Sequence, residues 1–451
     1  MSPPKQLVLS FATLILVGTA LLSLPAMTPG PGRLPLPDAL FTATSAVCVT
    51  GLIVVDTATA FTVPGQVVIL VLLQLGGLGI MTFSVFVLMI LGRRISMGQD
   101  NLMEEVFTQG PFRDKRTLVF YILVFTLVAE LVGALVFFSV WGREYQLGHA
   151  VFLSVFHAIS AFCNAGFSLF SNSLTDYAAN PVVVLNTAVL IILGGLGFFA
   201  TFEIAHMAAR KAGLAKAPRR NLSLHTRLVL ASSTLLLLFG AVFFLFVEYN
   251  HAMAEFSIPV KLMTAFFQSV TARTAGFNTV DFGHISNAVA LVFILLMFIG
   301  ASPGSCGGGI KTTTLAVMVA TIRHYLMGHY RANLFARSIP RNVTARAMGI
   351  TIGSAAVITV SLVALLLTQL GDAPHDESRG MFLELFFEAV SAYGTVGLSM
   401  GATEYLNTGG KAIVIMLMFV GRLGPLTVAL SFVPRKKKAA FEYSEENVMI
   451  G

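Results

Sequence analysis

A short apolar segment that occurs four times, each time ending at a glycine, constrains this chain more than any other feature. In every copy a phenylalanine stands ten residues before the glycine, and a leucine or a phenylalanine follows it. The copies are 41–52, 156–167, 266–277 and 387–398. Each copy is too short to cross a bilayer, which takes about 20 apolar residues. The regular spacing indicates four copies of one structural unit.

Long uncharged runs separate these segments and predict an all-α polytopic membrane protein. Hydrophobic residues make up 56% of the chain and charged residues only 11%, whereas soluble domains average about 25% charged. The first run has no signal-type cleavage site and is interpreted as a span. Eight candidate spans lie at about 7–26, 66–91, 117–140, 181–203, 228–248, 286–322, 347–370 and 410–433.

The net charge of +7 is interpreted as a topology signal. Most of the 29 lysines and arginines lie at the two chain ends and in the connectors 92–116, 210–227 and 323–346. The positive-inside rule places these connectors and both termini in the cytoplasm. This distribution argues against nucleic-acid binding. Five basic residues fall on the opposite side: Arg33, Arg143, Lys261, Arg379 and Lys411.

Three cysteines, Cys48, Cys163 and Cys306, lie in predicted membrane segments. An odd number at this depth argues against a disulfide framework, and their spacing matches no zinc site. We interpret them as small packing residues.

Each unit is predicted to contain a span, a half-helix, the glycine and a second span. A further glycine recurs in the second spans, at Gly76, Gly194, Gly300 and Gly421. Because two spans return the chain to the same side, the units are parallel and surround an axis along the membrane normal. This favours a central pore over the midplane site of an inverted-repeat carrier. The predicted boundaries are 1–92, 93–212, 213–336 and 337–434, followed by a cytoplasmic tail, 435–451.

The glycine-ended stretches have the chemistry of an ion filter. Irregular backbone at membrane depth is tolerated only where it lines a cavity or is buried in protein. Rings of backbone carbonyls can replace the hydration shell of potassium, and glycine reaches the left-handed conformations that turn carbonyls inward. The C-terminal ends of the half-helices add partial negative charge. Because the four stretches contain no carboxylate, selectivity is expected to be a backbone property that favours a weakly hydrated monovalent ion.

Six motifs carry a family resemblance: TSAVCVTGL (44–52), FHAISAFCNAGF (156–167), FFQSVTARTAGFNTVD (266–281), FFEAVSAYGTVGL (386–398), GASPGSCGGGIKTTT (300–314) and GRLGPLT (421–427). Together they resemble the Trk/Ktr/HKT superfamily of potassium transporters, and within it the membrane subunits of Ktr systems. A serine in the first copy accompanies sodium preference there, so Gly51 implies potassium. The implied filter residues are Val49, Thr50, Gly51, Asn164, Ala165, Gly166, Thr274, Ala275, Gly276, Thr395, Val396 and Gly397.

The second span of the third unit is expected to break at 300–312, because five glycines and a proline do not sustain a helix. The stretch has one residue too many for a phosphate-binding P-loop and follows no strand. The resemblance implies an intramembrane gate loop; a static kink is the alternative. The implied gate residues are Gly300, Ala301, Ser302, Pro303, Gly304, Ser305, Cys306, Gly307, Gly308, Gly309 and Lys311, with Arg422 lining the path below the filter.

The roles of two other charged residues stay open. Arg273 is interpreted as a structural residue that braces the filter by hydrogen bonds to backbone carbonyls. Glu130 is either a structural carboxylate or an ion site. The outer-side carboxylates either attract cations or belong to solvated loops; they are Asp56, Glu144, Asp176, Glu255, Asp281, Asp372, Asp376, Glu377 and Glu404.

The expected function is potassium uptake across the inner (cytoplasmic) membrane of a bacterial cell, without enzymatic activity or a cofactor. The resemblance further implies sodium dependence, a homodimer with contacts at Glu442–Gly451, and a cytosolic ring of RCK-type nucleotide-binding subunits (KtrA-like) on the basic connectors. A sodium-selective or TrkH-like relative is the main alternative. An organic-solute carrier lacks support from the parallel repeat, and a membrane enzyme lacks clustered acids, bases or metal ligands.

Overall fold

The computed structural model describes residues 3–30, 32–79, 115–213, 222–329, 331–371, 373–374, 376 and 378–432. Within these ranges the chain is a bundle of helices with one short antiparallel hairpin, formed by β1 (Asn333–Leu334) and β2 (Arg337–Ser338). The all-α membrane fold predicted from the sequence is confirmed. The tail 435–451 and most of the connector 92–116 lie outside the described residues.

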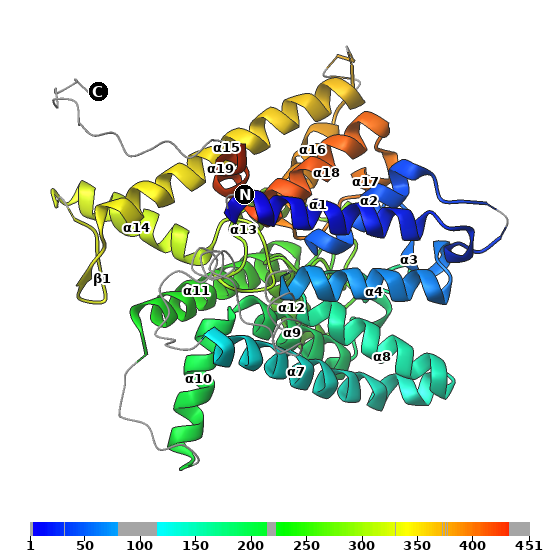
Figure 1. Ribbon diagram of the computed structural model, residues 1–451, viewed down its shortest axis with the longest axis horizontal. Helices are drawn as coiled ribbons and strands as arrows, with labels where there is room; N and C mark the ends of the chain where they lie inside the picture. The colour runs from blue at the N-terminus through cyan, green and yellow to red at the C-terminus, as the bar shows by residue number, and fades with distance from the viewer. Residues whose placement is uncertain are drawn as a thin grey trace.

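Four long apolar helices begin the four units, and each has the length and hydropathy of a membrane span. Figure 1 shows them running in the same direction, with their first residues towards the left of the view. This is the parallel arrangement expected when each unit crosses the membrane twice. The four helices are α1 (Pro3–Leu22), α7 (Lys115–Glu144), α11 (Leu224–Glu248) and α15 (Arg341–Gln369).

A short helix follows each long one and ends inside the bundle; we call these the pore helices. After a loop and a short helical turn, a second helix leads back out. The pore helices are α2 (Leu36–Cys48), α8 (Leu147–Phe162), α12 (Ile258–Thr271) and α16 (Met381–Gly394). The second helices are α4 (Val63–Leu78), α9 (Pro181–Gly195), α13 (Asn287–Phe298) and α18 (Thr408–Leu423). The small elements between the pore helices and the second helices are α3 (Thr57–Ala60), η2 (Thr175–Tyr177), η3 (Phe282–His284) and α17 (Ala402–Tyr405), while η1 (Pro25–Met27) lies between α1 and α2.

The units form a closed ring, because the second helix of each packs against the pore helix of the next. Helix α4 contacts α8, α9 contacts α12, and α13 contacts α16, while α18 of the last unit returns to α2 of the first. An ion pair of 2.6 Å between Lys411 Nζ and Asp38 Oδ1 ties the first turns of α18 and α2 together. Both side chains are mostly buried, and Asp38 also lies favourably at the positive end of the α2 dipole.

Two second spans that the sequence predicted as continuous are sharply bent. The run 181–203 divides into α9 and α10 (Phe198–Lys211), which meet at 106°, and the run 410–433 divides into α18 and α19 (Pro425–Phe432), which meet at 95°. Gly197 and Gly424 occupy the two bends with φ of +89° and +83°. Such a conformation ends a right-handed helix, and glycine adopts it without strain. The candidate spans 181–203 and 410–433 are thus present as bent pairs, and the sequence analysis did not indicate the bends.

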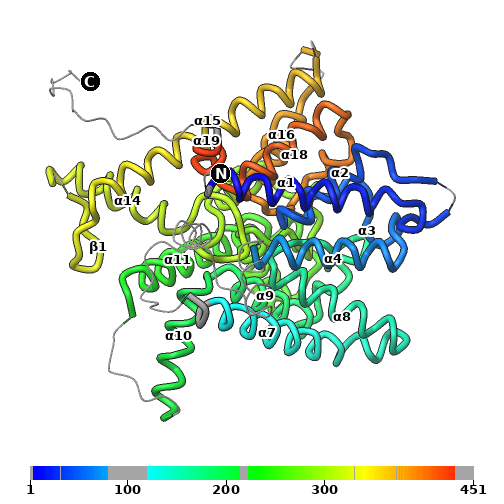
Figure 2. The backbone as a smooth tube through the Cα atoms, in the orientation of Figure 1, coloured from blue at the N-terminus to red at the C-terminus, as the bar shows by residue number. Residues whose placement is uncertain are grey.

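The second span of the third unit is interrupted by irregular chain rather than by a bend. Helix α13 ends at Phe298 and α14 (Thr312–Leu326) begins fourteen residues later. Gly79, which follows α4, has a φ of +80°, and the rest of that span lies outside the described residues. Four helices of the described part therefore qualify as spans by themselves, or six when each bent pair counts as one. Figure 2 shows α10 leading away from the bundle towards the bottom of the view and α14 towards the left.

Candidate functional site

The loops after the four pore helices meet in a ring of backbone. A Cβ atom placed on Gly166 would lie 2.6 Å from the carbonyl oxygen of Ala275, and one on Gly276 would lie 2.6 Å from that of Val396. A Cβ atom on Gly51 would overlap Ala165 O, and one on Gly397 would overlap Thr50 O. Each glycine thus faces the carbonyl that precedes the glycine of the next unit, and the fourth unit faces the first. No side chain fits into this ring.

All four loops adopt the same unusual backbone conformation. The glycines have φ between +70° and +90°. Two residues earlier, Val49, Asn164, Thr274 and Thr395 also have positive φ, between +50° and +74°. Left-handed conformations cost a non-glycine residue about 1–3 kcal/mol and persist only where the surroundings enforce them. Four independent occurrences at one position make this conformation a property of the unit.

Hydrogen bonds from the pore helices hold these strained loops. The N–H groups of Thr50, Ala165, Ala275 and Val396 donate to the carbonyls of Ser45, Ser160, Thr271 and Ser391, respectively, at 2.8–3.0 Å. The hydroxyls of the same four residues bond again beyond the turn. Ser45 and Ser391 accept from the N–H of Gly51 and Gly397 at 3.1 Å, whereas Ser160 and Thr271 donate to the carbonyls of Phe167 and Phe277 at 2.7 and 2.6 Å. One hydroxyl residue therefore fixes each loop from both ends.

The third loop has one residue fewer than the others. Ser45, Ser160 and Ser391 stand six residues before their glycines, but Thr271 stands five before Gly276. The fully buried phenylalanines of the pore helices, Phe41, Phe156, Phe267 and Phe387, show the same offset. The buried counterpart of the other phenylalanines is therefore Phe267, and the sequence alignment on Phe266 is one residue out of register in this unit. A repeated glycine spacing does not reveal where the helix ends.

A second set of bracing side chains was missed by the sequence reasoning. His157 Nε2 lies 3.0 Å from Ser168 Oγ, Gln268 Nε2 donates to Thr279 Oγ1 at 3.0 Å, and Glu388 accepts from Ser399 Oγ at 2.8 Å. Glu388 also accepts a hydrogen bond from Thr403. All three bracing residues are buried, and each follows the buried phenylalanine of its pore helix directly. That shared position, occupied by Thr42 in the first unit, was the available signal.

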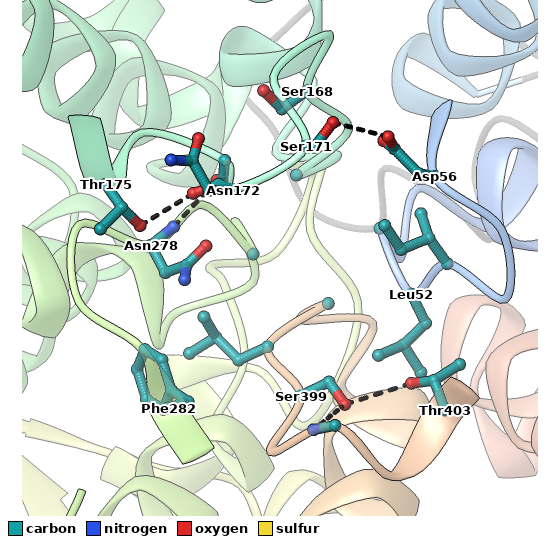
Figure 3. Close-up of a pocket in the computed structure, with 18 of the residues that line it drawn as sticks. Leu52, Asp56, Ser168, Ser171, Asn172, Thr175, Asn278, Phe282, Ser399 and Thr403 are labelled. Carbon is teal, nitrogen blue, oxygen red and sulfur yellow. Dashed lines mark hydrogen bonds between the residues drawn. The ribbon is translucent and has the colours of Figure 1, made fainter. Parts of the chain in front are cut away.

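A cavity of about 490 Å³ opens on one side of the ring, and the four glycines form part of its lining. Figure 3 shows its polar side chains converging from segments of all four units. Three of the nine outer-side carboxylates line it, namely Asp56, Asp281 and Glu404. Asp56 accepts a hydrogen bond from Ser171 at 2.6 Å, which joins the first and second units at the rim. The cavity therefore carries negative charge beside the ring.

The irregular segment 300–312, the candidate gate loop, lies against the other side of the ring. The N–H of Gly308 donates to Thr395 Oγ1 at 3.0 Å. A Cβ atom on Gly307 would overlap Thr274 Oγ1, and one on Gly308 would overlap Thr395 Oγ1. Ser302 and Cys306 donate through their N–H groups to Gly195 and Gly194 of α9 at 3.1 Å. Close contact with two strained loops and with the second unit requires glycine here.

Two cations hold the candidate gate loop by its carbonyls. Lys311 Nζ donates to the carbonyls of Gly307 and Gly308 at 2.7 and 3.3 Å. Arg422 donates to the carbonyl of Cys306 and also to those of Gly76 and Gly77 at the end of α4. The Arg422 side chain thus joins the first unit, the fourth unit and the loop. The sequence placed Arg422 near the path but did not indicate these partners.

Two other charged residues lie apart from the ring. Arg273 donates to the carbonyl and hydroxyl of Ser233 in α11, at 3.3 and 3.2 Å. It therefore braces the end of α12 against α11. The predicted hydrogen bond to a backbone carbonyl is present, and that carbonyl belongs to α11 rather than to the ring. Glu130 Oε2 accepts from Gln74 Nε2 at 3.3 Å, whereas its buried Oε1 has no hydrogen-bond partner among the described residues, so both interpretations of this carboxylate stay open. The three cysteines are free and buried.

The twelve predicted filter residues all lie in the four loops of the ring, and the predicted gate residues lie beside it. Their arrangement defines a membrane protein with a pore formed by four units of one chain. The family model described as "TrkH: Cation transport protein" matches residues 13–442. The chain belongs to this family of cation transport proteins, within the Trk/Ktr superfamily, as its motifs predicted.

Relatives of known name match over nearly their whole length. The chain is 39% identical to "Ktr system potassium uptake protein B" of Bacillus subtilis (strain 168), covering 100% of this chain and 97% of that protein. It is 34% identical to "Potassium/sodium uptake protein NtpJ" of Enterococcus hirae, covering 100% and 98%. The crystal structure of the potassium transporter TrkH from Vibrio parahaemolyticus superposes with a TM-score of 0.69 at 20% identity, over 95% of this chain and 84% of that one. This last similarity is one of fold.

Removing the Glu388 carboxylate is expected to loosen the loop after Gly397. In Glu388→Ala the hydroxyls of Ser399 and Thr403 lose their acceptor, which should lower stability by about 1–3 kcal/mol, measured as the thermal unfolding midpoint in detergent. Glu388→Gln keeps one acceptor oxygen and should lose less. Glu404→Ala, at an exposed position on the same rim, should change stability by less than about 0.5 kcal/mol. Equal losses at 388 and 404 would contradict the bracing role.

Proposed function

We propose that this chain conducts potassium ions across the bacterial cytoplasmic membrane through the glycine ring, and thereby serves potassium uptake. The closed cycle of backbone carbonyls facing glycines carries the proposal, because carbonyl rings replace the hydration shell of potassium. The loops of the ring contain no carboxylate, which disfavours divalent ions. The names of the relatives from Bacillus subtilis and Enterococcus hirae support the same cargo. Potassium is the substrate, and no cofactor is invoked.

The electrostatics give the path a direction of entry. The cavity with Asp56, Asp281 and Glu404 concentrates cations before the ring, and the C-terminal ends of the pore helices add partial negative charge at it. We place this cavity outside the cell. Both termini and the exposed arginines of the segment 323–346 (Arg323, Arg331, Arg337, Arg341 and Arg346) then lie in the cytoplasm.

In this proposal the candidate gate loop obstructs the path on the inner side of the ring, and transport requires it to move. The contacts that hold it are hydrogen bonds to carbonyls and hydroxyls, from Arg422, Lys311 and Gly308 and from the N–H groups of Ser302 and Cys306. Bonds of this kind contribute about 0.5–3 kcal/mol each, so a conformational change elsewhere can break them. Glycine at positions 307–309 permits the loop to rearrange.

The exposed surface around the hairpin β1–β2 is a candidate docking site for a second protein that regulates transport. Arginines, Tyr325 and Phe335 are exposed there, on α14, β1–β2 and the start of α15. Such a mixture of arginine and aromatic side chains is typical of protein interfaces. We propose that a cytosolic ring of RCK-type nucleotide-binding subunits docks on this surface. A homodimer formed through the tail 442–451 remains part of the proposal, although those residues lie outside the described range.

Potassium flux into liposomes is the direct test of the function. The reconstituted full-length chain should take up potassium or rubidium along its gradient, and external sodium should increase the rate if transport is sodium-dependent. Protein-free liposomes serve as the control. Sodium uptake that equals potassium uptake would favour the alternative of a sodium-conducting relative. No uptake of either ion by folded protein would overturn the proposal.

Serine at position 51 or 276 should reduce selectivity for potassium over sodium. A side chain at Gly51 meets Ala165 O, one at Gly276 meets Val396 O, and both positions have left-handed backbone. A change of about tenfold in the ratio of rubidium to sodium uptake, equivalent to about 1.4 kcal/mol, is expected. Gly30→Ser is the matched control, because Gly30 has a φ of +92° but nothing near its Cβ position. An unchanged ratio in Gly51→Ser and Gly276→Ser would refute a filter at the ring.

Deleting residues 303–309 should raise the potassium flux. The deletion removes the Cys306 carbonyl that Arg422 binds and the backbone that lies against Thr274 and Thr395. Arg422→Met, which keeps the loop but removes its anchor, should give a smaller increase. Thermal unfolding and gel filtration check that each variant folds. An unaltered or lower flux in both folded variants would show that the loop is a static kink.

A further inference from the structure

Arg273 is a buried cation whose hydrogen-bonding capacity is largely unused. Its side chain is 8% exposed. A guanidinium has five N–H donors, and among the described residues those of Arg273 reach only Ser233, at 3.3 Å for the carbonyl and 3.2 Å for the hydroxyl. Its Nε has no hydrogen-bond partner in the described part of the chain.

Arg273 also lacks a counter-ion among the described residues. The ion pairs found there join Lys411 to Asp38 and His284 to Asp281. A charged side chain at membrane depth is costly unless it faces protein partners or water. The Glu130 and Glu388 carboxylates bond to Gln74, Ser399 and Thr403 instead. An anion supplied from outside the chain would satisfy the Arg273 charge.

A cavity of about 150 Å³ leads to Arg273 from the side of the bundle. It lies between α9 and α11, where both pack against α12, and Figure 1 shows these three helices grouped together. Its walls are almost entirely apolar and include Ile192, Leu196, Leu230 and Leu237. Arg273 is the charged residue in its lining.

The cavity opens onto the surface that meets lipid. Thr234 in its lining is exposed, and its neighbours Leu235, Leu238 and Phe239 are 69%, 59% and 51% exposed. Large apolar side chains exposed to this extent on a span face acyl chains. A ligand that enters here comes from the bilayer and must combine an apolar body with an anionic group.

We propose that this crevice binds a long-chain fatty acid, with its carboxyl group at Arg273 and its chain between α9 and α11. The cavity of about 150 Å³ takes the carboxyl end of the ligand, and the rest of its chain extends into the bilayer along the exposed face of α11. Ser233, the residue next to the guanidinium, lies nine residues into α11 and so roughly 13 Å along the helix. A phosphodiester stays charged and at the headgroup level, whereas a carboxylic acid can enter the apolar region in its neutral form.

The bound carboxyl group would satisfy the free Nε donor and neutralise the buried charge. Ala301 of the candidate gate loop lines the same cavity. Gly195, also in the lining, accepts the hydrogen bond of the Ser302 N–H. The ligand would therefore contact the base of the loop and the end of the third pore helix together.

Binding of radiolabelled oleate to the purified full-length protein in nanodiscs tests the proposal. The wild type should show saturable binding. Arg273→Gln should weaken it by about tenfold or more, the loss typical of a hydrogen-bonded charge. Leu230→Trp, which fills the crevice without touching the arginine, should also abolish it. Arg227→Gln, at an exposed position on the same helix, is the matched control and should bind as the wild type does.

A change of ligand keeps the test valid if Arg273→Gln fails to fold. Oleyl alcohol, which has the same chain without the charge, should compete at least about tenfold more weakly than unlabelled oleate for the wild-type protein. Absence of saturable binding, or equal competition by oleyl alcohol, would overturn the proposal. Equal competition by phosphatidylglycerol would replace the fatty acid with a headgroup phosphate and would also overturn it.

Discussion

The structure depends on one constraint: backbone that is not helical must have its polar groups satisfied inside a membrane. Four loops depart from helical geometry at the centre of the bundle, with two left-handed residues each. Their N–H groups are held by the ends of the pore helices and by Ser45, Ser160, Thr271 and Ser391. The carbonyls before the glycines therefore have no N–H partner from a helix. Such free carbonyl oxygens can coordinate an ion. The packing of each second helix on the next pore helix keeps the four loops at one level.

Three cations at membrane depth follow from the same constraint. Arg422, Lys311 and Arg273 donate to backbone carbonyls or a hydroxyl rather than to carboxylates. Irregular backbone near the ring offers many such acceptors, and a carbonyl holds a cation less tightly than a carboxylate does. Arg422 and Lys311 therefore hold the candidate gate loop in place through contacts that can still be broken. A carboxylate in place of the Cys306 carbonyl would lock the same contact more firmly.

The repeat made the architecture predictable, because a glycine spacing shared by four segments reports directly on a repeated unit. The ring could be located for that reason, and the loop beside it because five glycines and a proline interrupt the second span of the third unit. The bends at Gly197 and Gly424 could not be located from the sequence. A straight span and a span bent at one glycine of positive φ have the same apolar composition. The shorter turn before Gly276 was hidden because Phe266 and Phe267 are adjacent, and the alignment fits either one. The partners of Arg273 and Arg422 are set by contacts between units, which no pattern within one unit records.

A ring made from a single chain has a genetic consequence that a ring of identical subunits does not. In a homotetramer every substitution is copied four times, so even a mild change at the ring alters all its sides at once. Here Thr50, Ala165, Ala275 and Val396 hold corresponding places and are already of three residue types, and a codon change reaches one of them alone. Substitutions in such a protein can therefore change ion preference one repeat unit at a time. The four units can also diverge until one serves regulation and another serves conduction alone.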